Sequence, residues 1–313
     1  MSININELVT TTLRDRNPFI ADNVTNTNAF LYKLDQNGRM KTAEGRVITE
    51  PLIYAENGTF KWYNGLETWN ITVEEVVDAA EYNWKMGGGF VYLTGEEKIK
   101  NRGAAQAIDL VEARVKAAEA TMKNQVGTSI YSDGTGSSSK EVGGLQLLID
   151  DDPTSAGTIG GIDQVANTFW RNQFSAAAAT TSANIRGRMN SMWLATLRGS
   201  DKVDLIMADN DMYTYYEESL QENIRYTTSK MADAGFESIK YKTADVCYDD
   251  QCPDKHMYFL NTDHLCMRYA PGRKFKVGKE REIQNADYSV WPFLFAGNLT
   301  CSNRSLQGVI IAS

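Results

Sequence analysis

Apolar residues between positions 94 and 127 recur every third or fourth residue, which is the spacing of one face of an α-helix. This stripe consists of Ile99, Ala104, Ile108, Val111, Val115, Ala118, Met122 and Val126. Thr94 and Glu97 have the spacing of a capping box, and Gly127 lies where a left-handed residue would end the helix. About 30 residues at 1.5 Å each give a rod of roughly 45 Å. The pattern therefore predicts one long amphipathic helix around which the rest of the chain is organised.

The segment 31–70 shows a different pattern, in which apolar and polar residues alternate without enough apolar surface for a core. It contains Asn37-Gly38 and Asn57-Gly58, two dipeptides typical of hairpin turns. Aromatic residues gather around the second dipeptide: Tyr54, Phe60, Trp62, Tyr63 and Trp69. One interpretation is a β-meander packed on the main core. The other is an extended hairpin whose aromatic tip packs on a neighbouring subunit, because exposed aromatic residues at this density are typical of interfaces.

Apolar periodicity and the residues that begin or end helices predict further elements. A capping box at Thr72 and Glu75 predicts a short helix over VEEVVDAAEYNW that ends at the glycines 87–89, with a short strand at FVYL. From residue 181 an α/β lobe is predicted, with a helix closed by Gly199, a buried strand over 203–207, and a second helix capped by Asp209. From residue 238 onward the chain is predicted to form strands, and the apolar C-terminal strand to lie within a sheet.

Composition and charge narrow the class of protein. The chain has 313 residues, 42% of them hydrophobic, which is ample for a packed core. A net charge of −8, with no run of five Lys or Arg, argues against a nucleic-acid-binding surface. The sequence shows neither a signal peptide nor an apolar stretch of membrane-spanning length. Four cysteines suggest a reducing compartment and free thiols, although the C-x4-C spacing of Cys247 and Cys252 also fits a zinc site or a strand-linking disulfide.

Catalytic signatures are missing from the sequence. It contains no G-x-S-x-G elbow, no G-x-x-x-x-G-K-[ST] loop and no H-E-x-x-H motif, and it has only two histidines. The acidic run 150–152 offers the oxygen ligands that Ca²⁺ takes, but a solvated acidic turn before Pro153 is the simpler interpretation. We therefore predict no catalytic, cofactor-binding or metal-ligating residues, and no enzymatic activity.

Several segments, in their order along the chain, resemble the major capsid proteins of tailed bacteriophages, which share the Hong Kong 97 fold. They are DNVTNTNAFLYKLDQNGR, GTFKWYNGLETW, WKMGGGFVYLTGEEKIKNRGAAQAIDLVEARVKAAEATMKNQ, YSDGTG, VGGLQLLIDDDPTSAGTIGGIDQVANTFWRN, MYFLNTDHL and NLTCSNRSLQGV. The resemblance covers nearly the whole chain and implies an α+β capsid fold. It implies an N-terminal arm (1–30), an extended loop (31–90), a peripheral domain with a spine helix (91–144), an axial domain (145–237), and peripheral-domain strands with a C-terminal return (238–313).

The resemblance also implies a structural function: self-assembly through hexamers and pentamers into an icosahedral shell that encloses double-stranded DNA without sequence-specific binding. The implied partners are further copies of the chain, portal and scaffolding proteins and a decoration protein, with no membrane and no cofactor. The implied location is the virion, after assembly in the cytoplasm of the host bacterium. Some members of this family crosslink a loop lysine to an asparagine of a neighbour, for which Lys61 with Asn298 or Asn303 are the nearest candidates.

Six residues are predicted to form contacts between subunits: Phe60, Trp62, Tyr63, Trp69, Arg14 and Phe19. Trp62, Tyr63 and Trp69 are expected to be the main anchors, because buried aromatic residues dominate the energy of interfaces. Three alternatives remain open at this point. They are an encapsulin-like nanocompartment shell, an α/β enzyme with a β accessory domain, and a secreted binding module.

Overall fold

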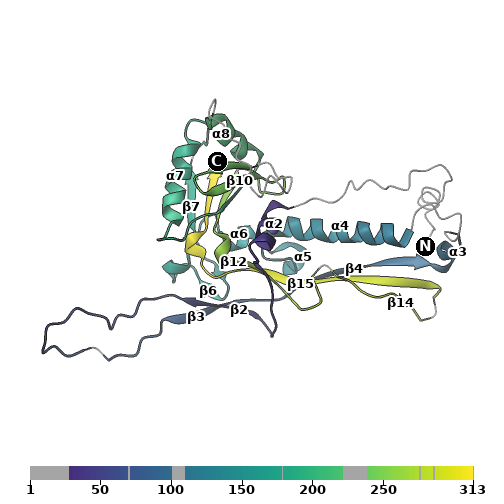
Figure 1. Cartoon of the computed structure of the whole chain (residues 1–313), viewed down its shortest axis with the longest axis horizontal. Coiled ribbons are helices and arrows are strands. Elements are labelled where there is room, and N and C mark those ends of the chain that lie inside the picture. Colours follow the sequence, from purple (N-terminus) through teal and green to yellow (C-terminus); the bar gives the residue numbers. More distant parts are fainter. Residues whose placement is uncertain are drawn as a thin grey trace.

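The computed structural model describes residues 28–69, 71–100, 110–177, 179–220, 238–274, 276–284 and 286–312. The described chain forms three parts (Figure 1). A lobe of helices and strands holds the C-terminal strand, and a long arm of strands and one helix extends from it. A thin hairpin leaves from the junction of lobe and arm and points away from the arm.

The arm is built on the first six-stranded sheet, in which the order is β1-β12-β15-β13 and both β4 and β14 also pair with β15. Its strands are β1 (Met40–Thr42), β4 (Lys85–Thr94), β12 (Leu265–Tyr269), β13 (Lys276–Val277), β14 (Arg281–Glu282) and β15 (Tyr288–Cys301). The β4–β15 pair is antiparallel and runs from Lys85 opposite Gly297 to Thr94 opposite Tyr288. This two-stranded ribbon forms the length of the arm.

Two helices lie in the segment for which the apolar periodicity predicts one long helix: α3 (Gly95–Lys100) and, beside the ribbon, α4 (Leu110–Ile130). Residues 101–109, which include the predicted stripe residues Ala104 and Ile108, lie outside the described residues. The capping box is confirmed: the backbone N–H of Glu97 donates to Thr94 Oγ1 (3.3 Å), and the backbone N–H of Thr94 donates to Glu97 Oε2 (3.0 Å). Met122 and Val126 are buried, so this end of the predicted stripe faces the core, whereas Ile99 at its other end is 75% exposed in the subunit.

The predicted end of this helix at Gly127 is wrong, because α4 continues to Ile130. Gly127 is buried, and a Cβ there would lie 3.0 Å from Gln251 Oε1 and 3.9 Å from Asn28. The glycine is therefore explained by the close approach of two other segments to the helix, and not by a left-handed backbone.

The lobe is built on the second six-stranded sheet, in the order β7-β16-β11-β8-β10-β9. Its elements are β7 (Gln173–Ala177), β8 (Leu205–Ala208), β9 (Ser238–Tyr241), β10 (Ala244–Tyr248), β11 (His256–Leu260), β16 (Gly308–Ala312), α7 (Ile185–Thr196) and α8 (Asn210–Leu220). The two predicted helices and the C-terminal strand are confirmed, and Asp209 caps α8 by accepting from the backbone N–H of Met212 (2.9 Å). The predicted strands between 238 and 260 lie in this sheet, where β10 and β11 both pair with β8 and β9 pairs with β10.

One helix that the sequence pattern did not reveal, α2 (Ala29–Gln36), ties the two sheets together. Asn28 caps it, and Asn37-Gly38 ends it, so this dipeptide does not form the predicted hairpin turn. Asn28 Nδ2 donates to Asp249 (3.1 Å), and Lys33 Nζ forms an ion pair with Asp245 of β10 (3.2 Å). The chain then continues directly into β1 of the first sheet.

The hairpin consists of β2 (Ile48–Ile53) and β3 (Val77–Tyr82), which pair in antiparallel register from Ile48 opposite Tyr82 to Ile53 opposite Val77. The predicted helix over VEEVVDAAEYNW is therefore wrong, as is the helix stop at the glycines 87–89, which lie inside β4. Pairing with β2 and burial of Ala80 and Tyr82 outweigh the local helix preference. Smaller elements complete the chain: α5 (Gly136–Ser139), α6 (Leu145–Leu148), β5 (Thr158–Ile159), β6 (Ile162–Asp163), η2 (Thr168–Trp170), η4 (Thr262–His264) and η5 (Arg304–Leu306).

Candidate inter-subunit surface

The base of the hairpin is part of the main core. Burial alternates strictly along β2, so that Ile48, Glu50 and Leu52 face inward, and Ala80 and Tyr82 of β3 join them. Alternation of this kind is expected where one face of a strand pair packs on a core. The base is therefore held by the fold of its own subunit.

A buried ion pair fixes this base to the first sheet. Arg268 of β12 donates to both carboxylate oxygens of Glu50, from Nε (2.6 Å) and from Nη2 (3.0 Å). The hydroxyl of Thr300 donates to the same carboxylate (2.9 Å). The hydrogen bonds to Glu50 raise the pKa of Arg268, and a bidentate pair of this kind fixes orientation as well as adding energy.

Tyr82 adds a second attachment. Its hydroxyl donates to the carbonyl of Cys301 (2.9 Å), and burial raises the pKa of Tyr82 far above its usual value, so that the hydroxyl stays protonated. On the outer side of β3, the backbone N–H of Glu81 donates to the carbonyl of Gly160 (2.9 Å). The direction in which the hairpin leaves the subunit is set by these contacts.

Beyond Ile53 and Val77 the two strands run on as a long extension, residues 54–76, in which no described residue is part of a helix or a strand. The chain turns at Asn64–Leu66, where the backbone N–H groups of Leu66 and Glu67 donate to the carbonyl of Asn64. Asn57-Gly58 was expected at the tip, but it lies on one side of the extension, where the backbone N–H of Gly58 donates to Glu74 across it (2.6 Å). Lys61 and Glu67 form an exposed ion pair (3.2 Å).

Tyr54, at the start of the extension, packs on Phe169 of the core, and the aromatic residues beyond it are exposed in the subunit. The exposed fractions are 90% for Trp62, 74% for Phe60, 67% for Trp69 and 59% for Tyr63. The rings contact only each other in two pairs among the described residues, with centroids 5.6 Å apart for Phe60 and Trp62 and 5.2 Å for Tyr63 and Trp69. Four of the six predicted interface residues thus lie together here, while Arg14 and Phe19 lie outside the described residues.

Sequence reasoning missed the aliphatic part of this surface. Three further apolar side chains of the extension are almost fully exposed: Leu66, Ile71 and Val73. The sequence could have indicated them, because they lie in a segment that has no core of its own. Apolar side chains that are exposed together in this way mark an interaction site.

Groups that might carry chemistry elsewhere are committed to the fold. All four cysteines are free and buried, and burial raises the pKa of Cys247 and Cys301 to about 12. Asp151 Oδ2 lies 3.1 Å from His256 Nε2, within hydrogen-bond distance, and Asp150 Oδ2 accepts from Gln164 Nε2 (2.7 Å). Across the described ranges, no group of three or more His, Cys, Asp and Glu side chains is arranged to hold a metal ion.

The suggested crosslink to Asn298 finds no free side chain. Asn298 is buried, its Oδ1 accepts from the backbone N–H of Gly143 (3.0 Å), and its Nδ2 donates to the carbonyl of Asn83 (2.9 Å). Asn303 caps the short helix η5 by accepting from the backbone N–H of Ser305 (3.1 Å). Both candidate amides therefore stabilise their own subunit.

No family model and no curated protein matches the sequence of this chain. Several solved structures match its fold. The capsid of cyanophage A-1(L) has a TM-score of 0.73 with 16% identity, covering 95% of this chain and 96% of that one. The capsid of the Myoviridae phage XM1 has a TM-score of 0.60 with 14% identity, covering 100% and 99%.

A cellular shell protein also matches. The SrpI encapsulin of Synechococcus elongatus PCC 7942 has a TM-score of 0.61 with 8% identity, covering 99% of this chain and 96% of that one. Within the described part of the chain, no helix has both the length and the apolar character needed to cross a membrane. The described part of this chain therefore has the Hong Kong 97 fold, which tailed-phage capsids and encapsulins share.

Proposed function

We propose that the chain is the major capsid subunit of a tailed bacteriophage, which assembles into an icosahedral shell around double-stranded DNA. One observation carries this proposal: a chain with a shell-forming fold exposes an anchored hairpin whose outer part has aromatic residues and no core. Burying an exposed aromatic side chain contributes about 1.5–3 kcal/mol. A closed symmetric shell uses such a contact many times, so modest contacts suffice to hold it together.

The capsid fold suggests a role for each part of the molecule. We assign the lobe with α7 and α8 to the axial domain, which gathers around the five-fold and six-fold axes, and β9–β11 belong to it by their pairing. The first sheet with α4 is assigned to the peripheral domain, 48–82 to the extended loop, and the segment before α2 to the N-terminal arm. Portal, scaffolding and decoration proteins are the expected partners, and the virion is the expected location after assembly in the bacterial cytoplasm.

The proposal predicts a difference between folding and assembly for Trp62→Ala. Because Trp62 is exposed in the subunit, we expect its free energy of unfolding to change by less than about 0.5 kcal/mol. Assembly should suffer far more, since truncating an interface anchor typically weakens association by about 2 kcal/mol or more. Denaturant titration of the free subunit and light scattering of assembly reactions measure the two effects.

Trp62→Phe is the matched control, because it keeps a ring at the same position and should retain most of the assembly. Equal loss of subunit stability and of assembly in Trp62→Ala would contradict the role of Trp62 as an anchor between subunits.

A nanocompartment shell remains the second candidate, because the encapsulin likeness covers the chain as fully as the phage likenesses do. The content of the particles separates the two functions. Shells purified after co-expression with the phage's other structural proteins should protect DNA from nuclease. Shells that instead enclose one defined protein, and no nuclease-resistant DNA, would support the nanocompartment.

A further inference from the structure

His256, the first residue of β11, lies within hydrogen-bond distance of two acceptors at once. Its Nε2 atom is 3.1 Å from Asp151 Oδ2, and its Nδ1 atom is 2.7 Å from the carbonyl oxygen of Asp254. A carbonyl and an ionised carboxylate only accept hydrogen bonds, so each ring nitrogen has to donate. A neutral imidazole has one N–H group, whereas the protonated ring has two. Both hydrogen bonds therefore exist together only when His256 carries a positive charge.

The surroundings of the His256 ring favour this charge. The titratable groups near it are Asp151 in the loop after α6, Asp209 at the end of β8, Asp254 and Lys255 in the turn before β11, and Tyr258, whose ring stacks on it. Opposite it on β16 lies Ile311, which carries no charge. Burial by itself lowers the pKa of His256. The hydrogen bonds to Asp151 and Asp254 and the nearby negative charges outweigh burial, so this pKa lies above its usual value.

Asp151 depends on the same contact. Its second carboxylate oxygen, Oδ1, is buried and makes no hydrogen bond within the described part of the chain. The ring of His256 is therefore the partner that compensates this carboxylate for its partial burial. Loss of the ring proton would leave the carboxylate beside a neutral group, and a partly buried charge without a partner favours movement toward water.

The loop after α6 continues into the β5–β6 pair, and together they reach from the lobe to the base of the hairpin. Gln164, directly after β6, donates from Nε2 to Asp150 Oδ2 (2.7 Å), so the two ends of this segment are joined. Between them, the carbonyl of Gly160 accepts from the backbone N–H of Glu81 in β3 (2.9 Å), and β6 lies beside the hairpin (Figure 1). The contact with His256 is thus one end of a connection between β11 and the hairpin base.

We propose that His256 and Asp151 form a pH-sensitive contact, which holds the segment 150–164 on the lobe while His256 is protonated and releases it as the pH rises. A second attachment of this segment does not titrate in that range, because Arg304 donates to Gln164 Oε1 (3.0 Å) and a guanidinium stays charged. The segment therefore stays attached at Arg304 and opens at Asp151. This inference concerns contacts within one subunit and does not depend on the shell function.

NMR titration of the folded subunit tests the charge directly, because the chain has only two histidines. His264 is the internal comparison. Burial lowers its pKa, and its Nδ1 atom lies 3.2 Å from the hydroxyl of Ser302, which is a suitable partner for a neutral ring. We expect the ring signal of His256 to titrate above the ordinary histidine pKa of about 6.5 and that of His264 below it. The variant His264→Asn assigns the two signals.

The variant Asp151→Asn tests the partner. It removes the negative charge and keeps the size of the side chain, so the titration of His256 should shift to lower pH. A pKa of His256 at or below about 6.5 in the original chain, or a pKa that Asp151→Asn leaves unchanged, would overturn the proposal.

Hydrogen exchange in the loop measures the release. After correction for intrinsic exchange rates, the amides of residues 150–156 should exchange roughly two- to fivefold more slowly when His256 is protonated, which is the range for a partly exposed ion pair. Spectra at about one pH unit below and two above the ordinary histidine pKa sample the two states. His256→Asn should abolish this pH dependence, and His264→Asn should retain it. An equal pH dependence in the original chain and in His256→Asn would contradict the proposal.

The unfolding free energy gives a third readout with a defined sign. Because the pKa of His256 is higher in the folded chain, the stability that the contact contributes is complete below the unfolded pKa and is lost as pH rises through the folded pKa. The original chain should therefore lose stability relative to His256→Asn over that range. If His256→Asn does not fold, the titration of the original chain still decides, since it needs no variant at this position.

Discussion

The lobe with α7 and α8 and the hairpin extension differ in where their apolar side chains find partners. In the lobe, both helices pack on one face of the second sheet, and residues such as Met189, Met212 and Phe259 are fully buried. In the extension, Trp62 and Leu66 are almost fully exposed. One region is stable because of its own core. The other carries large apolar side chains that, beyond Tyr54, are exposed in the subunit.

This difference shows how one chain can divide folding from assembly. The lobe and the first sheet bury apolar cores within the subunit, and the base of the hairpin joins the core through Tyr82 and is fixed to the first sheet through Glu50. Beyond Tyr54, the extension adds little burial to the subunit, so its apolar surface is available for contacts between copies. Perturbations should therefore affect stability and assembly separately, depending on where they fall.

Removal of the extension should have the largest effect. Ile53 and Val77 face each other in the hairpin, so Asn-Gly in place of residues 54–76 would close it with a two-residue turn. We expect a folded, soluble subunit with an unfolding free energy within about 1 kcal/mol of the original, and complete loss of shells. Circular dichroism and light scattering measure the two properties, and shells formed by the shortened chain would contradict the division.

A cavity in the lobe should have the opposite signature. Phe259→Ala removes a fully buried ring between the sheet and its helices, and such changes destabilise a core by about 3–5 kcal/mol. The free subunit should unfold at clearly lower denaturant concentration, and assembly should fail only because less folded subunit is present. An unchanged denaturation midpoint would show that the lobe is not the stable part of the molecule.

The same substitution at one glutamate of the base and one of the extension compares how much each region contributes to stability. Glu50→Ala leaves Arg268 without its partner in a mostly buried site, and we expect a loss of roughly 2–3 kcal/mol in unfolding free energy. Glu67→Ala breaks an ion pair in which both side chains are about half exposed, and we expect a loss of less than about 1 kcal/mol. Denaturant titration of both variants tests the difference, and equal losses would contradict it.

A smaller effect is expected in the pH dependence of the unfolding free energy, through Asp249. This residue joins the start of α2 to the end of α4. Its carboxylate accepts from Tyr131 Oη (2.7 Å) and Asn28 Nδ2 (3.1 Å), and burial raises its pKa despite these hydrogen bonds. The folded chain therefore holds a proton that the unfolded chain releases as pH rises from the unfolded to the folded pKa. Stability contributed by this group increases as pH falls through that window.

The unfolding free energy of the original chain minus that of Asp249→Asn isolates this term. The difference should grow in favour of the original chain as pH falls from neutral toward the ordinary pKa of an aspartate. A difference that is constant over this range, or that shrinks, would contradict the burial of this carboxylate.

Local signals in the sequence were sufficient for the start of α3, for most of α4 and for the helices of the lobe. Thr94 and Glu97 form the predicted capping box, and Asp209 caps α8, because such caps depend only on neighbouring residues. The helix end predicted at Gly127 was wrong for a physical reason. Glycine is favoured both at a left-handed helix end and where two segments approach closely, and the sequence does not distinguish the two. The aromatic cluster on the extension was predicted, although its turn lies at Asn64–Leu66 and not at Asn57-Gly58.

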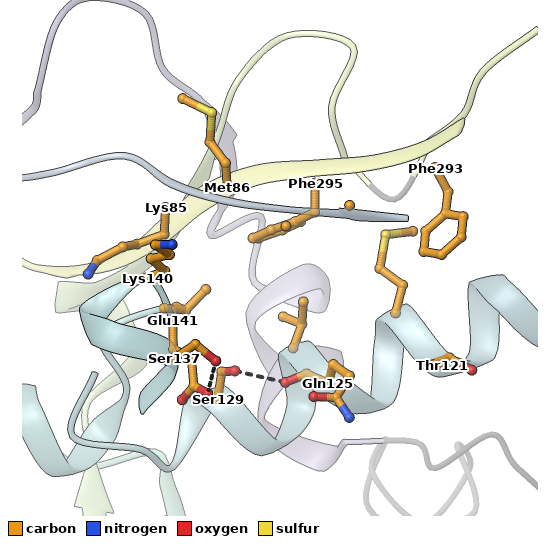
Figure 2. Close-up of a pocket in the computed structure, with 15 residues that line it drawn as sticks. Lys85, Met86, Thr121, Gln125, Ser129, Ser137, Lys140, Glu141, Phe293 and Phe295 are labelled. Atoms are coloured by element: carbon orange, nitrogen blue, oxygen red, sulfur yellow. Dashed lines mark hydrogen bonds between the residues drawn. The ribbon is translucent and has the colours of Figure 1, made fainter. Parts of the chain in front are cut away.

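The remaining features depend on contacts between distant segments. Strand β3 has a helix-like sequence, and its partner β2 decides its conformation from outside the segment. Strand β10 pairs in parallel with β8, from which α8 and β9 separate it along the chain, so its sheet could not be assigned from its own alternation. A groove lined by Gly87, Met122 and Phe295 forms where α4 packs beside β4 and β15 (Figure 2), and no spacing of residues along the chain predicts it.

The size of the purified protein under assembly conditions tests the central claim most directly. Light scattering and negative-stain imaging should show closed, hollow shells of uniform diameter, with or without a scaffolding protein. A stable 34.9 kDa monomer under every condition tried, with no larger species, would contradict the account and point to a protein that functions as a single subunit.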